Sequence, residues 1–309
     1  MRNFFFFLLI SAGLSSCSED FFSQTLNIDP PEYEKQLVVH GFGNDRDSFF
    51  RVSVTRNFGI LENVPDTAWA VRNATVEVLE DGQVKATLAM APAPQPQEVY
   101  AALVLPGFFQ PGKTYQLKVA HPDFETVTSS QVMPQPVAVD SVRFRQKAGI
   151  DTDGSKISAV DVFLNDAPGV QNFYEVRVTI NYPKLAFTFD SIGMVTHIDT
   201  VGYEEFPVEL IGSDDPNAVL TFGDGLAITD RFFDGQSYRF VARMYETGGY
   251  TFRVYVRTVT REYYSWALSA ERKYNSEDFP LAEPITTYSN LENGIGAFGL
   301  WQEQVFYVK

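Results

Sequence analysis

Cysteine is almost absent from this chain of 309 residues, and Cys17 is its single example. The rest of the chain therefore forms no internal disulfide and has neither a thiolate nucleophile nor a thiolate metal site. Histidine is scarce too: His40, His121 and His197 lie far apart and lack the paired spacing of a zinc site. Neither a G-x-S-x-G elbow nor a phosphate-binding glycine loop occurs. The chain thus shows no familiar reaction centre.

Positive charge is the second shortage. The chain has 24 Lys and Arg residues against 39 Asp and Glu residues, which gives a formal net charge of −15. A surface of this sign repels phosphate groups, so we expect neither a nucleic-acid partner nor electrostatic attachment to an anionic bilayer.

A long apolar run is missing as well. The stretch 4–14 provides about half of the roughly 20 residues that a membrane-spanning helix needs.

That short apolar stretch predicts an export signal. Arg2 precedes it, and it ends at Leu14-Ser15-Ser16-Cys17, which has the pattern of a bacterial lipobox. In such signals the cysteine thiol takes a diacylglyceryl group, and cleavage makes the cysteine the new N-terminus, whose amine is then acylated with a chain such as palmitate. Several acyl chains hold a protein firmly where one does not. We therefore expect a signal peptide at 1–17 and lipid attachment at Cys17; the alternative is a plain secretory signal with a chance cysteine.

A polar spacer is expected at 18–34. It begins with Ser18-Glu19-Asp20, and acidic residues directly after a lipidated cysteine resemble the surface-export signal of Bacteroidota lipoproteins. The simpler interpretation is a solvated linker. We expect an outer-membrane, lipid-anchored protein, with exposure at the cell surface as the further alternative.

The body of the chain predicts a mainly β fold built from two β-sandwich-like domains. Short candidate strands fill 35–133, and their number and spacing favour an immunoglobulin-like sandwich. The candidates are 35–40, 49–57, 74–80, 83–90, 99–105, 114–120 and 125–132. Asp81-Gly82 stands between two of them and suits a type I′ hairpin turn, because both residues tolerate positive φ angles.

A Pro-rich linker at 134–138 separates this domain from a second β-rich domain at 139–309. Residues 173–180 and 250–257 alternate strictly between apolar and polar, as half-buried antiparallel strands do. The helical pattern over 261–274, with Thr260 as N-cap, predicts one helix that covers the second domain. Its aromatic residues Tyr263, Tyr264 and Trp266 are expected in the core; a sugar-binding patch is the alternative.

Several predicted turns contain carboxylates, which are ligands that calcium accepts. Asp151-Thr152-Asp153-Gly154 opens like a calcium loop but lacks the distal ligands, so a hairpin turn is favoured. Asp214-Asp215 and Asp224 are similar. A two-carboxylate glycosidase site is not ruled out, because its residues need not be neighbours in sequence. We assign no catalytic, metal or cofactor-binding residue, and expect no cofactor.

The segment Tyr288 to Gly299 is rich in residues that tolerate close backbone approach. Tyr288, Asn290, Asn293, Gly294 and Gly296 are candidates for a partner or ligand surface. The competing interpretation is a tight turn that leads into a last strand at 303–308.

The C-terminal runs from Val256 to Tyr264, from Leu281 to Ile285 and from Tyr288 to Gly299 resemble a Bacteroidota lipoprotein family, known as domain of unknown function forty-two forty-nine. The likeness extends to the lipobox and to the segments at Lys35 and Asn73. The resemblance implies an envelope lipoprotein, often encoded near TonB-dependent outer-membrane receptors, and it implies no catalytic residue.

Two classes of function follow. The first is a non-catalytic binding or assembly protein, tethered to the membrane through Cys17, that works beside a TonB-dependent receptor; its ligand is unknown. The second is a surface hydrolase acting on glycan or peptide, which predicts a cleft with paired carboxylates of perturbed pKa. A structural or adhesive module is a third possibility that the sequence does not separate from the first.

Overall fold

The computed structural model describes residues 32–59, 61–65, 69–91, 99–246, 248, 250–276 and 285–309. The chain divides into two compact units, one made of Met1–Glu34 and Phe58–Asn63 and the other of Lys35–Asn57 and Val64–Lys309. The predicted signal peptide and Cys17 lie outside the described residues, as does most of the predicted spacer. All that follows concerns the second, larger unit.

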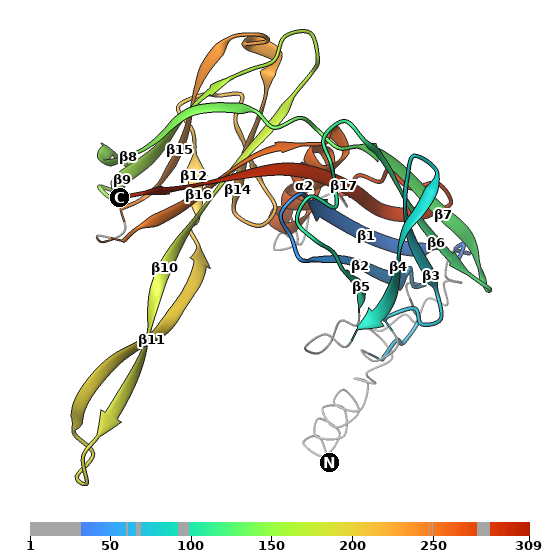
Figure 1. Ribbon diagram of the computed structural model, residues 1–309, viewed down its shortest axis with the longest axis horizontal. Coiled ribbons are helices and arrows are strands. Elements are labelled where there is room, and N and C mark those ends of the chain that lie inside the picture. The colour runs from blue at the N-terminus through green and yellow to red at the C-terminus, as the bar shows by residue number, and fades with distance from the viewer. Residues whose placement is uncertain are drawn as a thin grey trace, which may run out of the picture. The chain divides into compact units, whose positions relative to one another are not determined.

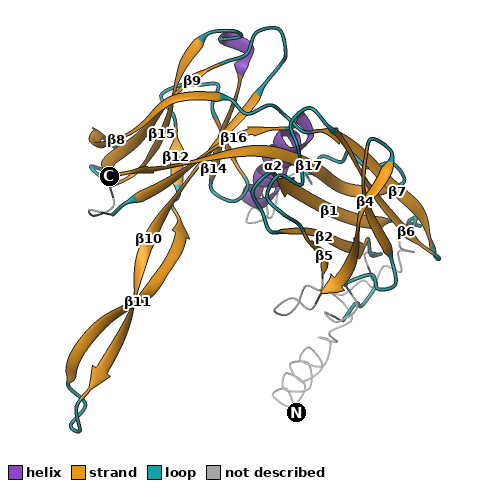
Figure 2. Ribbon diagram, viewed as in Figure 1, coloured by secondary structure: helices purple, strands orange, loops and turns teal. Residues whose placement is uncertain are grey.

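The fold is mainly β, as predicted (Figure 2). The first half provides the strands that the alternating pattern predicts, and their bounds are β1 Leu37–Asn44, β2 Phe49–Arg56, β3 Thr75–Glu80, β4 Gln83–Ala91, β5 Val99–Leu103, β6 Thr114–His121 and β7 Phe124–Val132. Asp81 and Gly82, with φ angles of 48° and 84°, join β3 to β4 in the predicted hairpin. Alternate side chains of β1, β2, β3 and β6 are buried in a first apolar cluster, which includes Val39, Val52 and Leu117.

The second half adds longer strands around a second apolar cluster. Their bounds are β8 Ala138–Ile150, β9 Lys156–Asn165, β10 Phe173–Phe189, β11 Val195–Pro207, β12 Leu210–Gly212, β13 Val219–Thr221, β14 Gly225–Thr229, β15 Ser237–Tyr245, β16 Phe252–Val259 and β17 Gly294–Val308. Val162, Val176 and Phe240 are among the fully buried members of this cluster. The sequence predicts separate strands at 173–182 and 187–191, but β10 runs through both without a break.

Two sheets contain these strands. The larger has 13 strands in the order β13-β14-β10-β16-β17-β1-β2-β5-β4-β3-β6-β7, with β11 paired to β10, and the smaller has the order β12-β15-β9-β8. Strand β17 lies near the middle of the larger sheet, parallel to β1 and antiparallel to β16 (Figure 1). It contributes Phe298 to the first cluster and Phe306 to the second. The division into two domains at 35–133 and 139–309 therefore stays a prediction, because one strand serves both halves.

Helix α2, Arg261–Ser276, confirms the predicted helix and its N-cap. The Thr260 hydroxyl accepts a hydrogen bond from the Tyr263 amide at 3.3 Å. Tyr263 and Ala267 are buried, and Trp266 packs on Phe42 with ring centroids 4.3 Å apart. The predicted aromatic patch is thus largely core packing. Helix α2 covers the start of β10, so Phe173 and Glu175 on its outer face are buried as well, whereas Arg177 and Thr179 further along are only partly buried, as the half-buried prediction expects.

Candidate functional site

The predicted contact residues near the C-terminus attach the segment before β17 to β17, β7 and α2. The Asn290 side chain donates to the Phe298 carbonyl at 2.8 Å and accepts from the Phe298 amide at 3.0 Å, and Asn293 donates to the Thr126 carbonyl at 3.2 Å. Asn293, with a φ of 58°, lies in a turn that leads into the last strand, as predicted, but β17 begins at Gly294, nine residues before the predicted start of that strand. Gly296 has a φ of 118°, and a Cβ there would overlap the Val39 carbonyl.

Tyr288 completes this group: its amide donates to the Ser269 hydroxyl at 2.8 Å. The five candidate residues therefore belong to one segment, and the polar groups of Tyr288, Asn290 and Asn293 described above are already hydrogen-bonded to other residues of the protein. Their proposed role as a partner surface stays a prediction.

The carboxylates expected in turns are found in turns. Asp153 accepts hydrogen bonds from the Ser155 amide at 2.8 Å and from its hydroxyl at 3.0 Å, which confirms the hairpin interpretation of that loop. His40 lies against Trp266, and burial lowers the pKa of its imidazole. His121 and His197 lie elsewhere: His121 contacts the Arg72 carbonyl, and His197 contacts Asp199.

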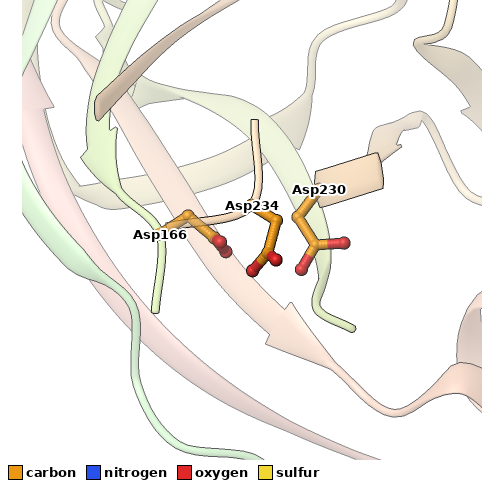
Figure 3. A group of neighbouring side chains, drawn as sticks. All are labelled: Asp166, Asp230 and Asp234. Atoms are coloured by element: carbon orange, nitrogen blue, oxygen red, sulfur yellow. The ribbon is translucent and has the colours of Figure 1, made fainter. Parts of the chain in front are cut away.

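A group of three aspartates, which the sequence interpretation missed, is the strongest metal-type cluster in the described part of the chain. Ligand atoms of Asp166, Asp230 and Asp234 lie within 4.8 Å of one another, and Figure 3 shows the three carboxylates converging. They come from the turn after β9 and from the short 3₁₀ helix Asp230–Phe232 with the loop behind it. Sequence spacing gives no sign of this cluster, because more than 60 residues separate Asp166 from the other two.

Protein donors already occupy several oxygens of the aspartate cluster. Tyr174 donates to Asp166, the Gly235 amide donates to Asp166 at 2.7 Å, and the Asn172 amide donates to Asp230 at 2.6 Å. Burial raises the pKa of Asp230, and the charges of Asp166 and Asp234 raise it further. Carboxylate oxygens are ligands that calcium accepts, so these are the described residues best suited to hold a cation.

A buried ion-pair network lies between β10 and α2. Glu175 is fully buried, and it accepts hydrogen bonds at 3.0 Å from both Arg177 and Arg257. Thr221 donates to it at 2.8 Å, and the Tyr263 hydroxyl donates at 3.2 Å. Burial alone would raise the pKa of Glu175 and favour its neutral form. The charges of the two arginines have the larger effect, and they lower this pKa to about 2. The same burial, together with the Glu175 charge, raises the pKa of Tyr263 to about 12. Glu175 is therefore a fixed anion at neutral pH rather than a proton donor.

The most exposed element is a two-stranded ribbon formed by β10 and β11. β10 pairs with β16 only as far as Ile180, whereas its pairing with β11 continues to Phe189. We call residues 182–206 the arm. Figure 1 shows it extending beyond the strands that hold its base, and almost all of its side chains are exposed.

One face of the arm is apolar. Leu185, Phe187 and Phe189 alternate along β10 and are each 42–59% exposed. Phe187 lies opposite Ile198, and Phe189 lies opposite Val195. Because directly opposed residues of an antiparallel pair share a face, these five side chains form one surface.

The opposite face of the arm is charged. Lys184 pairs with Glu204 at 2.9 Å, and His197 pairs with Asp199 at the same distance. Ala186 lies opposite Asp199 on this face. The arm is therefore amphipathic, although neither of its faces covers a core.

The apolar pattern of β10 changes face at Pro183. Before it, the even-numbered side chains Tyr174, Val176 and Val178 are buried in the second cluster. Beyond it the odd-numbered side chains are the apolar ones, so the apolar face of the arm does not continue the core face. Contiguous exposed apolar side chains of this kind mark interaction sites in proteins.

The tip of the arm is an ordered turn. Asp190 accepts hydrogen bonds from the amides of Ile192 and Met194, each at 2.9 Å. This turn holds two apolar side chains in solvent, Ile192 being 78% exposed and Met194 64% exposed. The arm can therefore offer apolar contacts along its face and at its end.

No helix among the described residues is both long and apolar enough to cross a membrane.

Comparison with solved structures gives weak likenesses only. The chain matches an α2-macroglobulin of Salmonella with 10% identity and a TM-score of 0.25, over 92% of this chain and 15% of that one. It matches a DUF4785 family protein of Legionella pneumophila with 9% identity and a TM-score of 0.21, over 71% of this chain and 50% of that one. A collagen adhesin of S. aureus matches with 9% identity and a TM-score of 0.16, over 88% of this chain and 93% of that one. At such scores the likenesses carry no argument about this protein.

A search of curated proteins found no match to the chain. A family model described as domain of unknown function (DUF4249), in contrast, matches residues 23–306. That match covers β1 to β16, α2 and nearly all of β17, including the arm. Since it extends over most of the sequence, the protein belongs to the DUF4249 family.

Proposed function

We propose that this protein is a lipid-anchored, non-catalytic binding or assembly protein of the bacterial outer membrane, and that the arm is its contact element. The single observation that carries the proposal is the exposed apolar face of the arm. A soluble protein rarely exposes such a patch unless it contacts a partner.

The partner that fits best is a protein with an apolar groove and a neutral or basic rim. The arm has four carboxylates, at Asp190, Asp199, Glu204 and Glu205, against one lysine, Lys184. This charge opposes binding to an anionic lipid surface and favours a complementary protein surface. The free edge of β11 adds a second mode of contact, because β11 pairs only with β10 among the described strands.

The anchor in this proposal is Cys17, and the proposed partner is a TonB-dependent receptor of a Bacteroidota outer membrane. The lipobox and the family resemblance support both parts. An anchor with several acyl chains confines the protein to the bilayer surface, which raises its effective concentration near any membrane-embedded partner.

The test is purification of the native protein from outer membranes in a mild detergent, with mass spectrometry of its N-terminus and of the proteins that co-purify. The proposal predicts an acylated Cys17 as first residue and stoichiometric recovery of one outer-membrane receptor. A freely soluble protein with an unmodified thiol, or repeated recovery without any receptor, would overturn it.

A further inference from the structure

A pocket separate from the arm lies where β13 and the start of β14 face the C-terminal end of α2. Its lining residues are Glu209, Leu210, Leu220, Thr221, Phe222, Gly223, Asp224, Gly225, Glu271, Tyr274 and Asn275. Its volume of about 490 Å³ is within the range of small-molecule sites. The proposed function makes no use of this pocket.

The charge of the pocket is one-sided. Glu209, Asp224 and Glu271 are carboxylates, and neither lysine, arginine nor histidine is among the described lining residues. The three have no ion-pair partner in the described part of the chain. Arg177, which is not a lining residue, donates to the Phe222 carbonyl at 2.8 Å and to the Gly223 carbonyl at 2.6 Å, and its charge is paired with Glu175.

Two aromatic rings form a corner of the pocket. Phe222 and Tyr274 have centroids 6.3 Å apart and an interplanar angle of 70°. Trp266 packs against Phe222, with ring centroids 5.9 Å apart. Aromatic faces attract cations, and proteins recognise quaternary ammonium groups with clusters of such rings.

We propose that this pocket binds an organic cation, specifically an alkylammonium group, between the Phe222 and Tyr274 rings, with the carboxylates around it supplying the counter-charge. A neutral sugar would use the rings but would leave three carboxylates without a counter-ion. A bare metal ion would use the carboxylates but would gain little from the rings. Only an organic cation uses both features.

Isothermal titration calorimetry of the full chain with choline tests the proposal directly. The matched probe is 3,3-dimethylbutan-1-ol, which has the shape of choline without its charge; glucose and calcium chloride complete the set. We expect saturable binding of one choline per chain, and binding of the uncharged probe weaker by at least about tenfold.

Two variants locate the site. Tyr274→Leu changes an exposed side chain, so it leaves the fold intact, and it should weaken choline binding about 5- to 30-fold. Asp224→Asn suits the positive φ of that residue, 61°, and should weaken binding severalfold. Their controls are Tyr203→Leu and Glu125→Gln, which make the same chemical changes at exposed positions outside the pocket and should leave choline binding within about twofold.

Three results would overturn the proposal. The first is the absence of saturable choline binding, and the second is equal affinity for choline and its uncharged analogue. The third is calcium or glucose binding that depends on Tyr274 and Asp224 while choline binding does not. None of these results bears on the arm, so they leave the proposed function unaffected.

Discussion

Glu175 keeps its negative charge inside the protein because Arg177 and Arg257 both reach it from neighbouring positions of the sheet. The three side chains sit on β10 and β16, which pair so that Glu175 lies directly opposite Arg257. The hydroxyl groups of Thr221 and Tyr263 donate two more hydrogen bonds to the Glu175 carboxylate. Removing one member of such a buried group leaves an uncompensated charge, which costs more than the ion pair contributes.

Glu175→Gln should therefore lower the free energy of unfolding at pH 7 by about 3 kcal/mol, measured by urea denaturation. The folded pKa of about 2 lies below the ordinary value of 4.5, so this stability is present above pH 4.5 and is lost as the pH falls toward 2. The difference between wild type and variant should shrink over that interval. Glu204→Gln removes an exposed ion pair on the arm and should change stability by less than about 1 kcal/mol; an equal loss in both variants would contradict the account.

Asp230 should show the opposite pH dependence. Because its folded pKa is raised, the folded state holds the proton more tightly than the unfolded state, and stability falls as the pH rises through the two pKa values. Asp230→Asn should therefore raise the melting temperature at pH 7, and the gain should disappear at pH 3. Asp153→Asn is the control: the pKa of Asp153 is lowered by its hydrogen bonds from Ser155, so that variant should lose stability at pH 7. A pH-independent effect of Asp230→Asn would contradict this assignment.

Strand β17 is the element on which the sheet depends, since it pairs with β1 on one side and with β16 on the other. Its glycines stand where another backbone comes close. Gly296→Ala would push a methyl group onto the Val39 carbonyl at a φ that alanine avoids, and should cost more than about 2 kcal/mol in urea denaturation. Gly202→Ala on the arm, where the added methyl meets no atom within 4 Å, should cost less than about 1 kcal/mol. Similar losses in the free energy of unfolding for Gly296→Ala and Gly202→Ala would show that β17 does not need a glycine at position 296.

The arm should contribute to binding without contributing to stability. The double variant Phe187→Thr and Ile198→Thr replaces one exposed cross-strand pair with residues that keep a high strand propensity. We expect the melting temperature to stay nearly constant while co-purification with the partner is lost. The matched pair Ala186→Thr and Asp199→Asn changes the other face and should retain the partner. Loss of stability in the first variant would instead make the arm part of the folding core.

Local patterns predicted most strands, but not the elements that depend on tertiary contacts. Asp81-Gly82 and Thr260 act within a few residues, so the sequence alone locates their hairpin and helix start. The strands predicted at 173–182 and 187–191 form one strand, β10, whose pairing with β11 continues to Phe189 after its pairing with β16 ends at Ile180. The last strand was predicted too short, at 303–308, because the parallel neighbour that needs the glycines of Gly294–Gly299 is about 250 residues away.

The candidate sites were harder to predict for the same reason. Alternation of Leu185, Phe187 and Phe189 was a visible signal, but a sequence does not tell a buried apolar face from an exposed one. The aspartate cluster and the cation pocket each join residues that lie far apart along the chain. Only the folded sheet brings them together.

At the scale of the whole molecule, a lipid at Cys17 would supply the attachment, and a large disulfide-free β body would carry the arm. The net charge of −15 opposes binding to anionic lipid, so we expect contacts with the envelope through specific surfaces. The apolar face of the arm is the surface best suited to such a contact.

Site-specific photocrosslinking in the native outer membrane tests this claim most directly. A photoreactive residue is placed at Phe187, on the apolar face, and in a second protein at its neighbour Ala186, on the charged face. The account predicts that position 187 crosslinks one TonB-dependent receptor in high yield, that position 186 does so weakly, and that Cys17→Ser reduces the yield at 187. Equal crosslinking from the two faces, or no receptor crosslinked from position 187, would contradict it.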